Sequence, residues 1–275
     1  MLKTLLAASV AAAALCSSAY AADLPRRAAP VVPIVAPAFT WTGFYIGGNA
    51  GYITDFDEYG IATSGVAANN IANVAGGLRP PVVASPSRDG FTGGGQVGFN
   101  YQVGFVVFGV EADAAYTDHR GTTTVLGTSG LSNSFSQRLD YLGTVRGRIG
   151  LAYDRVLFYA TGGFAYGDVR YSTNFLNAAG ATQFAGVYNG TDTGYALGAG
   201  IEYALPTDSF LNIFNSSAVT VKGEYLHFEL QDRTINSAAL PVVAAGAAST
   251  GSYNTRFETK GDLVRAGINF KFGTY

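Results

Sequence analysis

The side chains best suited to acid–base or metal chemistry in this chain are two histidines, His119 and His227. A catalytic histidine acts beside a nucleophile or an acid, and a metal-binding histidine needs further ligands close to it. Neither stands in a His-x-Ser arrangement, and no cysteine, methionine or carboxylate cluster accompanies the pair. We therefore expect two exposed histidines in a protein that is not an enzyme and holds no cofactor or metal. Capture of haem or a metal by the two histidines stays open as the alternative.

An acidic group formed by Asp55, Asp57 and Glu58 could bind a cation through its carboxylates. The ligands of a calcium loop follow a fixed spacing, which these three residues do not match. We expect a solvated loop at this position.

Most other charged residues alternate with apolar ones. In the segment Leu263–Phe272, Val264 and Ile268 share one face, and Arg265 and Lys271 share the other. Alternation with period two indicates a β-strand, because successive side chains point to opposite faces. The pattern recurs along the chain, with aromatics on one face and charges on the other. It predicts an all-β fold, a transmembrane antiparallel up-and-down β-barrel that is apolar outside and polar inside.

The alternation predicts eight strands, at residues 42–52, 91–102, 105–117, 137–151, 156–168, 193–203, 219–228 and 259–272. Short and long connections alternate, as expected when short turns face the periplasm and long loops face outside. The long segments Thr54–Asp89 and Leu230–Arg256 lack sustained alternation, so we expect mobile surface loops there. The apolar content of Ile61–Val83 leaves open an added hairpin and a ten-stranded barrel.

The predicted facing directs eleven charged side chains into the barrel. They are Glu111, Asp113, Arg138, Asp140, Arg146, Arg148, Glu202, Lys222, Glu224, Arg265 and Lys271. Eight strands enclose an interior just wide enough to be filled by side chains, and charges held there must be paired. We interpret the set as a lumen charge network that plugs the barrel, with inward glycines making room for long arginines. The alternative is the lining of a selective pore.

The N-terminal residues have the features of a secretory signal. Residues 1–21 contain the positive Lys3, the apolar run Leu5–Leu15 and the small-x-small sequence Ala19-Tyr20-Ala21. Residues 22–40 are rich in proline and predict an extended periplasmic linker, which leaves residues 41–275 for the barrel. The single cysteine, Cys16, lies within the signal, so the mature chain is expected to contain no disulfide.

The composition narrows the class of protein. The chain has 17 basic and 19 acidic residues and a net charge of −2, which does not indicate nucleic-acid binding. After the signal there is no apolar run long enough for a membrane helix. An exported chain with 36 glycines and 13% aromatic residues is typical of an outer-membrane barrel. A secreted β-sandwich is the alternative from composition alone.

Several segments carry a resemblance to a known family. Phe39–Tyr52, with the sequence FTWTGFYIGGNAGY, follows the proline-rich linker and resembles the start of small alphaproteobacterial outer-membrane proteins. These are known as porin-family outer-membrane β-barrel proteins. Tyr141–Gly150, Tyr195–Tyr203 and Val264–Phe272 are similar to later strands of the family. The resemblance covers essentially the whole mature chain.

The C-terminus departs from the family's pattern. The family usually ends on an aromatic residue directly after the last strand, and this residue assists insertion into the membrane. Here Gly273 and Thr274 separate Phe272 from the terminal Tyr275.

The resemblance implies an integral protein of the outer membrane of a Gram-negative bacterium. We expect it to stabilise the envelope and to present loops to the outside. A small porin for limited solutes and a surface binder of haem or host molecules remain alternatives. The expected partners are outer-membrane lipid and lipopolysaccharide, together with the barrel-assembly machinery through the C-terminal strand. The ligand of the outer loops is unknown.

Overall fold

The computed structural model describes residues 39–54, 60–84, 89–128, 130–206, 209–214, 216–241 and 250–273. The expected signal peptide and residues 22–38 of the expected linker lie outside these ranges. The acidic group of Asp55, Asp57 and Glu58 lies outside them as well.

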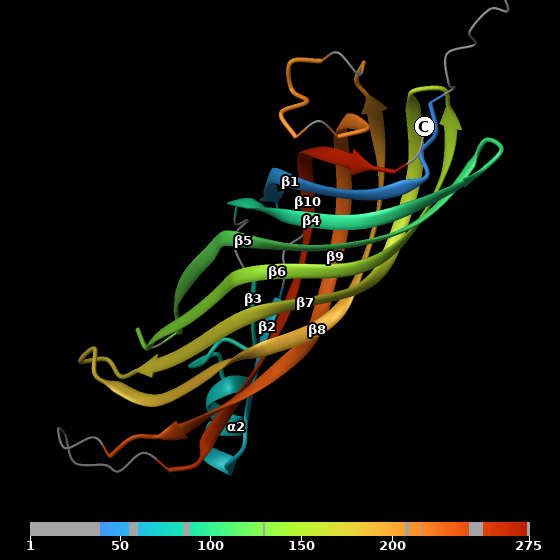
Figure 1. Cartoon of the computed structure of the whole chain (residues 1–275). Coiled ribbons are helices and arrows are strands. Elements are labelled where there is room, and N and C mark those ends of the chain that lie inside the picture. The colour runs from blue at the N-terminus through green and yellow to red at the C-terminus, as the bar shows by residue number, and fades with distance from the viewer. Residues whose placement is uncertain are drawn as a thin grey trace, which may run out of the picture. The chain divides into compact units, whose positions relative to one another are not determined.

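Eight antiparallel strands form a closed ring (Figure 1). They are β1 (Gly43–Thr54), β4 (Gly90–Val103), β5 (Val106–Leu126), β6 (Ser132–Tyr153), β7 (Val156–Leu176), β8 (Thr182–Ala204), β9 (Ala218–Ala239) and β10 (Ser252–Phe272). Each strand pairs with the next one along the chain, and β1 pairs with β10, which closes the ring. Closure leaves no free sheet edge around the barrel. The prediction of an eight-stranded up-and-down barrel is confirmed.

The connection between β1 and β4 adds short elements outside the ring. β2 (Gly60–Gly65) pairs with the extracellular part of β10, and β3 (Val82–Ala84) pairs with β2. The helix α2 (Ala68–Ala75) lies between them, at the end of the barrel that holds the long hairpins (Figure 1). The added hairpin that the sequence left open therefore exists, but it extends the sheet on one side instead of widening the barrel. Among the described residues, no helix is long and apolar enough to cross a membrane.

The strands from β5 to β10 have 21 to 23 residues each, roughly one and a half to two times the lengths that the sequence pattern predicted. The segment Leu230–Arg256, expected to be a mobile loop, supplies the ends of β9 and β10. The reason is that alternation continues beyond the membrane with its polarity inverted. In β6, for example, Phe135 points inward and is fully buried, whereas Ser134 and Ser136 point outward. Water surrounds this part of the barrel and an apolar core fills it.

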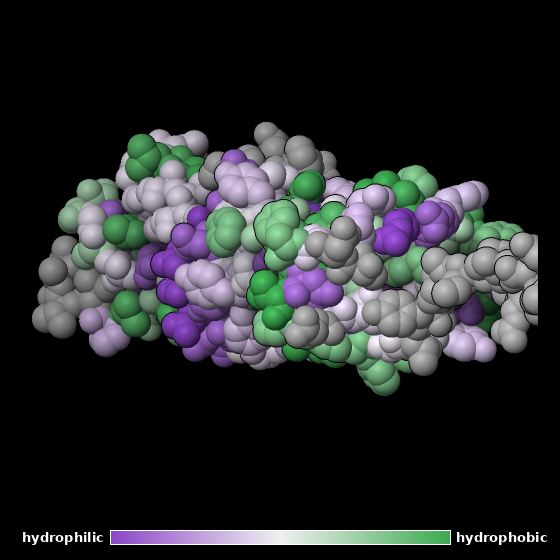
Figure 2. Space-filling view, turned by 45° about the horizontal axis from the view of Figure 1, so that its top comes forward, coloured by the Kyte–Doolittle hydropathy of each residue, from purple (hydrophilic) through white to green (hydrophobic). Residues whose placement is uncertain are grey.

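A belt of exposed apolar side chains surrounds the lower part of the barrel. It is bounded by two aromatic girdles. The lower girdle contains Phe44, Tyr101, Phe105, Tyr153, Phe158, Tyr203 and Phe272, and the upper girdle contains Tyr52, Tyr116, Tyr141, Tyr195 and Tyr225. In the face shown in Figure 2, hydrophilic residues gather in a band beside areas where hydrophobic residues predominate. Aromatic girdles mark the two interfaces of a membrane.

The spacing of the girdles fits a lipid bilayer. Along β6 the distance from Tyr153 to Tyr141 is about 40 Å at ~3.3 Å per residue. With the usual tilt of barrel strands, this corresponds to a height of about 30 Å, the thickness of the hydrocarbon layer. The belt between the girdles therefore faces lipid, and the strand ends above the upper girdle lie outside the membrane.

A matched pair of substitutions tests this placement. Val145→Arg puts a cation on the lipid-facing belt and should lower the free energy of unfolding by about 2–4 kcal/mol. Val187 also points outward, on β8 above the upper girdle, and is 76% exposed. Val187→Arg should therefore change stability by less than about 0.5 kcal/mol. Reversible unfolding of both refolded variants measures the difference, and equal losses would refute the placement.

Candidate functional site

The interior of the membrane-spanning part contains a cluster of eight charged side chains, here called the charge network. Its members are Glu111 and Asp113 of β5, Arg146 and Arg148 of β6, Glu202 of β8, Lys222 and Glu224 of β9, and Arg265 of β10. All eight belong to the set expected to line the lumen. Period-two alternation directs all eight side chains into the barrel, because each occupies an inward position while its sequence neighbours face lipid.

Arg146 is the centre of the charge network. Its Nη2 atom donates to Glu111 at 2.7 Å and to Asp113 at 2.8 Å, and its Nη1 atom donates to Glu224 at 2.9 Å. Its Nε atom donates to the hydroxyl of Thr144, which in turn donates to Asp113. One guanidinium therefore connects carboxylates from two strands that are distant in the sequence.

Arg265 and Lys222 close the network on the opposite wall. Arg265 donates from Nε to Glu224 at 2.7 Å and contacts Asp113 at 3.1 Å. The Lys222 ammonium donates to both carboxylate oxygens of Glu111, at 2.8 and 2.9 Å. Each of these carboxylates is thus held by more than one cation.

Arg148 lies nearer the periplasmic end and pairs with Glu202 at 2.7 Å. Its guanidinium stacks over the ring of Tyr159, with a distance of 3.9 Å to the centroid. Tyr45 joins the two parts, since it accepts from Arg148 at 3.1 Å and donates to Glu111 at 2.8 Å. The planar guanidinium suits this combination of pairing and stacking.

The charge network is electrically balanced and buried. It contains four cations and four carboxylates, and the relative exposure of their side chains is between 0% and 2%. A buried charge without a partner would cost several kcal/mol, whereas a fully paired cluster avoids that cost. The arrangement holds the interior wall together and leaves none of these eight groups free to bind a solute.

Glycines on the inner wall make this packing possible. A Cβ atom at Gly109 would lie 2.8 Å from the side chain of Arg148. A Cβ atom at Gly51 would lie 2.6 Å from the Cβ of Arg265. The expected role of glycine beside long arginines applies at these two positions. A Cβ atom at Gly98 would instead overlap the ring of Tyr45.

Lys271 is buried in the lumen but stands apart from the charge network. Its ammonium lies 5.6 Å from the centroid of the Phe39 ring. Phe39 packs against a small apolar cluster near the periplasmic end. The cluster consists of Trp41, Val107, Ala152, Leu157, Tyr159 and Ala204. Lys271 therefore belongs to the periplasmic closure of the barrel.

The inward placement predicted for Arg138 and Asp140 is wrong. A bulge in β6 places Asp140 as an extra residue between the pairs Leu139↔Val169 and Tyr141↔Asp168. A bulge shifts the alternation by one residue, so every side chain beyond it changes face. Leu139 is consequently buried at 1% exposure, and Arg138 and Asp140 lie on the outer surface, where they form an ion pair.

An apolar core fills the barrel above the charge network. It is rich in aromatic side chains, and six of the buried ones are Phe135, Tyr171, Phe175, Phe184, Tyr253 and Phe257. Tyr171 stacks on Phe257 with centroids 4.8 Å apart, and Phe175 lies at the same distance from Tyr253. The sequence pattern predicted surface loops for all six. A useful signal was available, because aromatics recur within the alternating segment Tyr171–Phe175.

Arg79 closes the core at the extracellular end and was not identified from the sequence. It lies between α2 and β3 and is 1% exposed. Its Nη1 atom donates to the carbonyls of Ser132 and Leu176 and to Asn133 at 2.8 Å. Its Nη2 atom donates to Gln183 at 3.0 Å. A single side chain thus ties the β1–β4 connection to β6, β7 and β8.

The surroundings of Arg79 are aromatic. The guanidinium carbon lies 5.5 Å from the centroid of Phe175 and 5.8 Å from that of Tyr253. Burial lowers the pKa of Arg79, and the contact with the Tyr253 hydroxyl acts in the opposite direction. Arginine remains charged at neutral pH in either case.

The two histidines differ in their surroundings. His119, expected to be exposed, points inward and is 4% exposed. His227 lies near the membrane surface, with Nδ1 at 3.0 Å from Asp262. Within the described residues, no group of three or more histidine, cysteine, aspartate or glutamate side chains is arranged to hold a metal.

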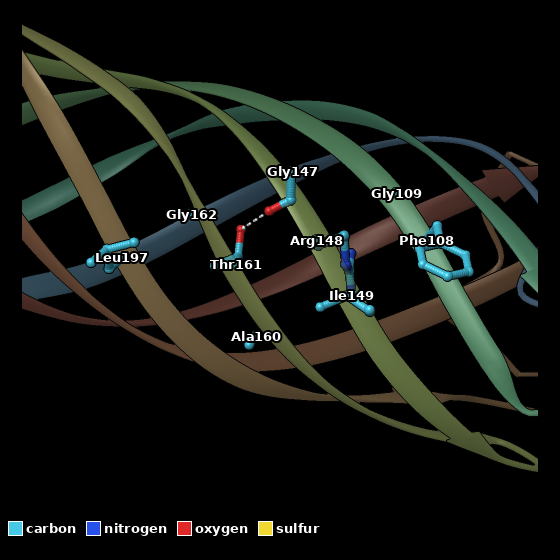
Figure 3. Close-up of a pocket in the computed structure, with 9 residues that line it drawn as sticks. All are labelled: Phe108, Gly109, Gly147, Arg148, Ile149, Ala160, Thr161, Gly162 and Leu197. Carbon is cyan, nitrogen blue, oxygen red and sulfur yellow. Dashed lines mark hydrogen bonds between the residues drawn. The ribbon is translucent and has the colours of Figure 1, made fainter.

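A hollow of about 410 Å³ lies on the outer wall, between β5 and β8. Figure 3 shows that small residues form its floor, among them Gly147, Ala160 and Gly162, while Thr161 donates to the carbonyl of Gly147 at 2.9 Å. Phe108, Ile149 and Leu197 border it and face lipid. This hollow opens on the lipid-facing belt.

Comparisons with known proteins agree with this architecture. Residues 7–272 match the family described as outer membrane protein beta-barrel domain. The 31 kDa outer-membrane immunogenic protein of Brucella melitensis is 33% identical over 275 residues, which cover 98% of this chain and 100% of that protein. The 22 kDa outer membrane protein of Rhizobium leguminosarum is 27% identical, covering 86% of this chain and 81% of its own length.

Among solved structures, the outer membrane protein OprG from Pseudomonas aeruginosa aligns over 85% of this chain and 97% of its own, with a TM-score of 0.49 and 13% identity. The matched residues include both the membrane-spanning parts of the strands and the strand ends above the upper girdle, here called the extracellular extension. The chain therefore belongs to the outer-membrane β-barrel family, with alphaproteobacterial relatives, and is located in the outer membrane of a Gram-negative bacterium.

Proposed function

We propose that this protein is a closed, non-catalytic barrel that stabilises the outer membrane and presents its extracellular hairpins to the outside. The observation that carries the proposal is the charge network, in which four cations and four carboxylates neutralise one another at 0–2% side-chain exposure. A pore needs solvated groups along its wall, whereas these groups bind each other.

The stacking of the layers supports the same conclusion. The periplasmic apolar cluster, the charge network and the aromatic core follow one another along the barrel axis, and Arg79 joins the core to the β2–α2–β3 segment. A solute would have to separate salt bridges and then pass tightly packed aromatic rings. Close-packed protein interiors contain few spaces larger than a water molecule.

The extracellular extension suits a role at the cell surface. Its outward positions carry threonine, serine and asparagine, as in Thr122, Thr124 and Ser134. A relative from Brucella melitensis is named an immunogenic outer-membrane protein. By extension, we propose that antibodies raised against intact cells would recognise the extracellular hairpins of this chain.

Liposome swelling separates this function from that of a small porin. Proteoliposomes loaded with an impermeant polymer should swell in isosmotic arabinose or glucose no faster than protein-free liposomes. A general diffusion porin reconstituted at the same protein-to-lipid ratio provides the positive control. Swelling that increases with the amount of this protein and slows with larger sugars would assign the porin function instead.

A further inference from the structure

Three arginines form a row on the outer surface, just above the membrane. Arg120 of β5 lies directly opposite Arg138 of β6, and Arg138 lies directly opposite Arg170 of β7. These three strands lie side by side in Figure 1. The side chains are 49%, 38% and 51% exposed. Like charges placed opposite each other across strands are destabilising, so the row calls for an explanation beyond folding.

Carboxylates below the row fix the orientation of the guanidinium groups. Asp118 contacts Nε of Arg120 at 2.6 Å. Asp140 contacts Nε of Arg138 and lies 3.3 Å from Nε of Arg170. In all three arginines the carboxylate therefore occupies Nε. Within the described residues, the Nη groups of Arg138 and Arg170 have no protein partner and remain available to an anion.

The row stands at the height of lipid headgroups. Arg120 follows Tyr116 of the upper girdle by four residues, and Arg138 precedes Tyr141 by three. With the usual strand rise and tilt, the row lies about 7–11 Å above the edge of the hydrocarbon. The headgroup region begins at that edge, and arginine binds phosphate there through paired N–H groups.

Hydroxyl and amide groups continue the surface outward. The next row consists of Thr122, Ser136 and Ser172, and the row after it consists of Thr124, Ser134 and Asn174. Tyrosines, arginines and hydroxyls thus succeed one another away from the membrane. A glycolipid with acyl chains, phosphate groups and sugars carries its matching groups in the same order, from the membrane outward.

We propose that Arg120, Arg138 and Arg170 bind the phosphate groups of a phosphorylated glycolipid of the outer leaflet, and that the hydroxyl rows contact its sugars. The proposal rests on the membrane placement of the barrel and is independent of whether the lumen is closed. A conducting barrel would overturn the proposed function and leave this site intact.

The test compares lipid binding by the full-length protein refolded in detergent. The probe is bisphosphorylated lipid A, with its dephosphorylated form as the matched ligand. The variant R120Q/R138Q/R170Q should bind lipid A roughly tenfold to a hundredfold more weakly than the wild type. The control variant R256Q/K260Q removes two outward cations from β10, on the opposite side of the ring, and should bind as the wild type does.

The wild type should also prefer lipid A to its dephosphorylated form, and the triple arginine variant should lose that preference. Heat-modified mobility on gels verifies that each variant is folded. If the triple variant fails to fold, the single variant Arg170→Gln replaces it, with an expected weakening of about threefold to fivefold. Replacing Thr122, Ser136 and Ser172 by Val, Ala and Ala should weaken lipid A binding by a smaller factor.

Three results would overturn the proposal. The first is unchanged lipid A affinity in the triple arginine variant. The second is equally tight binding of vesicles of phosphatidylglycerol, or full displacement of lipid A by millimolar inorganic phosphate, because either would show that no glycolipid is recognised. The third is binding that survives the arginine substitutions but disappears with EDTA. That result would show that a divalent cation, and not the arginines, links the lipid phosphates to this surface.

Discussion

Arg146→Ala should lower the free energy of unfolding by about 3–5 kcal/mol, because it leaves buried carboxylates without their shared cation. Glu111, Asp113 and Glu224 all contact this guanidinium within 2.9 Å, and their side chains are at most 2% exposed. Reversible urea unfolding of the protein refolded in lipid vesicles measures the change, followed by tryptophan fluorescence of Trp41 and by heat-modified mobility.

The matched control for this substitution is Arg256→Ala. Arg256 is also an arginine paired with a carboxylate, Asp232, but its side chain is 55% exposed. Exposed pairs contribute roughly 0–1 kcal/mol, so the control should stay close to the wild type. Similar small losses in both variants would mean that water reaches the interior and screens the charge network.

Arg79→Ala should loosen the β2–α2–β3 segment at the end of the barrel and leave it attached through the pairing of β2 with β10. The substitution removes hydrogen bonds to β6, β7 and β8, and Arg79 is the side chain that makes them. Loss of two charge-assisted hydrogen bonds alone corresponds to about 3 kcal/mol. Hydrogen exchange should accelerate by roughly a hundredfold in residues 60–84, while the amides between the aromatic girdles keep their protection.

Arg170→Ala provides the comparison for the β2–α2–β3 segment, since Arg170 is 51% exposed and, among the described residues, forms its ion pair with Asp140. Exchange in residues 60–84 should be unaffected by that change. If Arg79→Ala left their exchange equally slow, the pairing of β2 with β10 would be sufficient to hold the segment. The hydrogen bonds from Arg79 to β6, β7 and β8 would then be secondary.

The sequence was sufficient to predict the membrane-spanning part because one rule applies throughout it. Lipid outside and polar groups inside produce regular alternation, as in Val264 to Phe272. The same rule located the inward positions of all eight members of the charge network. The rule could not show which charges form ion pairs, since the pair of Arg146 and Glu224 joins strands that are not neighbours in the ring.

The errors arose where the surroundings of the strands change. Above the upper girdle the core is aromatic and the outside is aqueous, so alternation with the opposite polarity was interpreted as loop. The bulge at Asp140 could not be recognised from the sequence, because one extra residue does not change the composition of the strand. It moved Arg138 and Asp140 from the lumen to the outer surface. Arg79 was missed because a lone arginine in an apolar loop carries no periodic signal.

Single-channel recording across a planar bilayer tests the central claim most directly, namely that the charge network and the aromatic core close the barrel. Insertion is verified independently by protease protection of the reconstituted protein. In 1 M KCl the wild type should give no steady conductance steps above the bare membrane. Uniform, long-lived steps that scale with salt concentration would show a water-filled lumen and contradict the account.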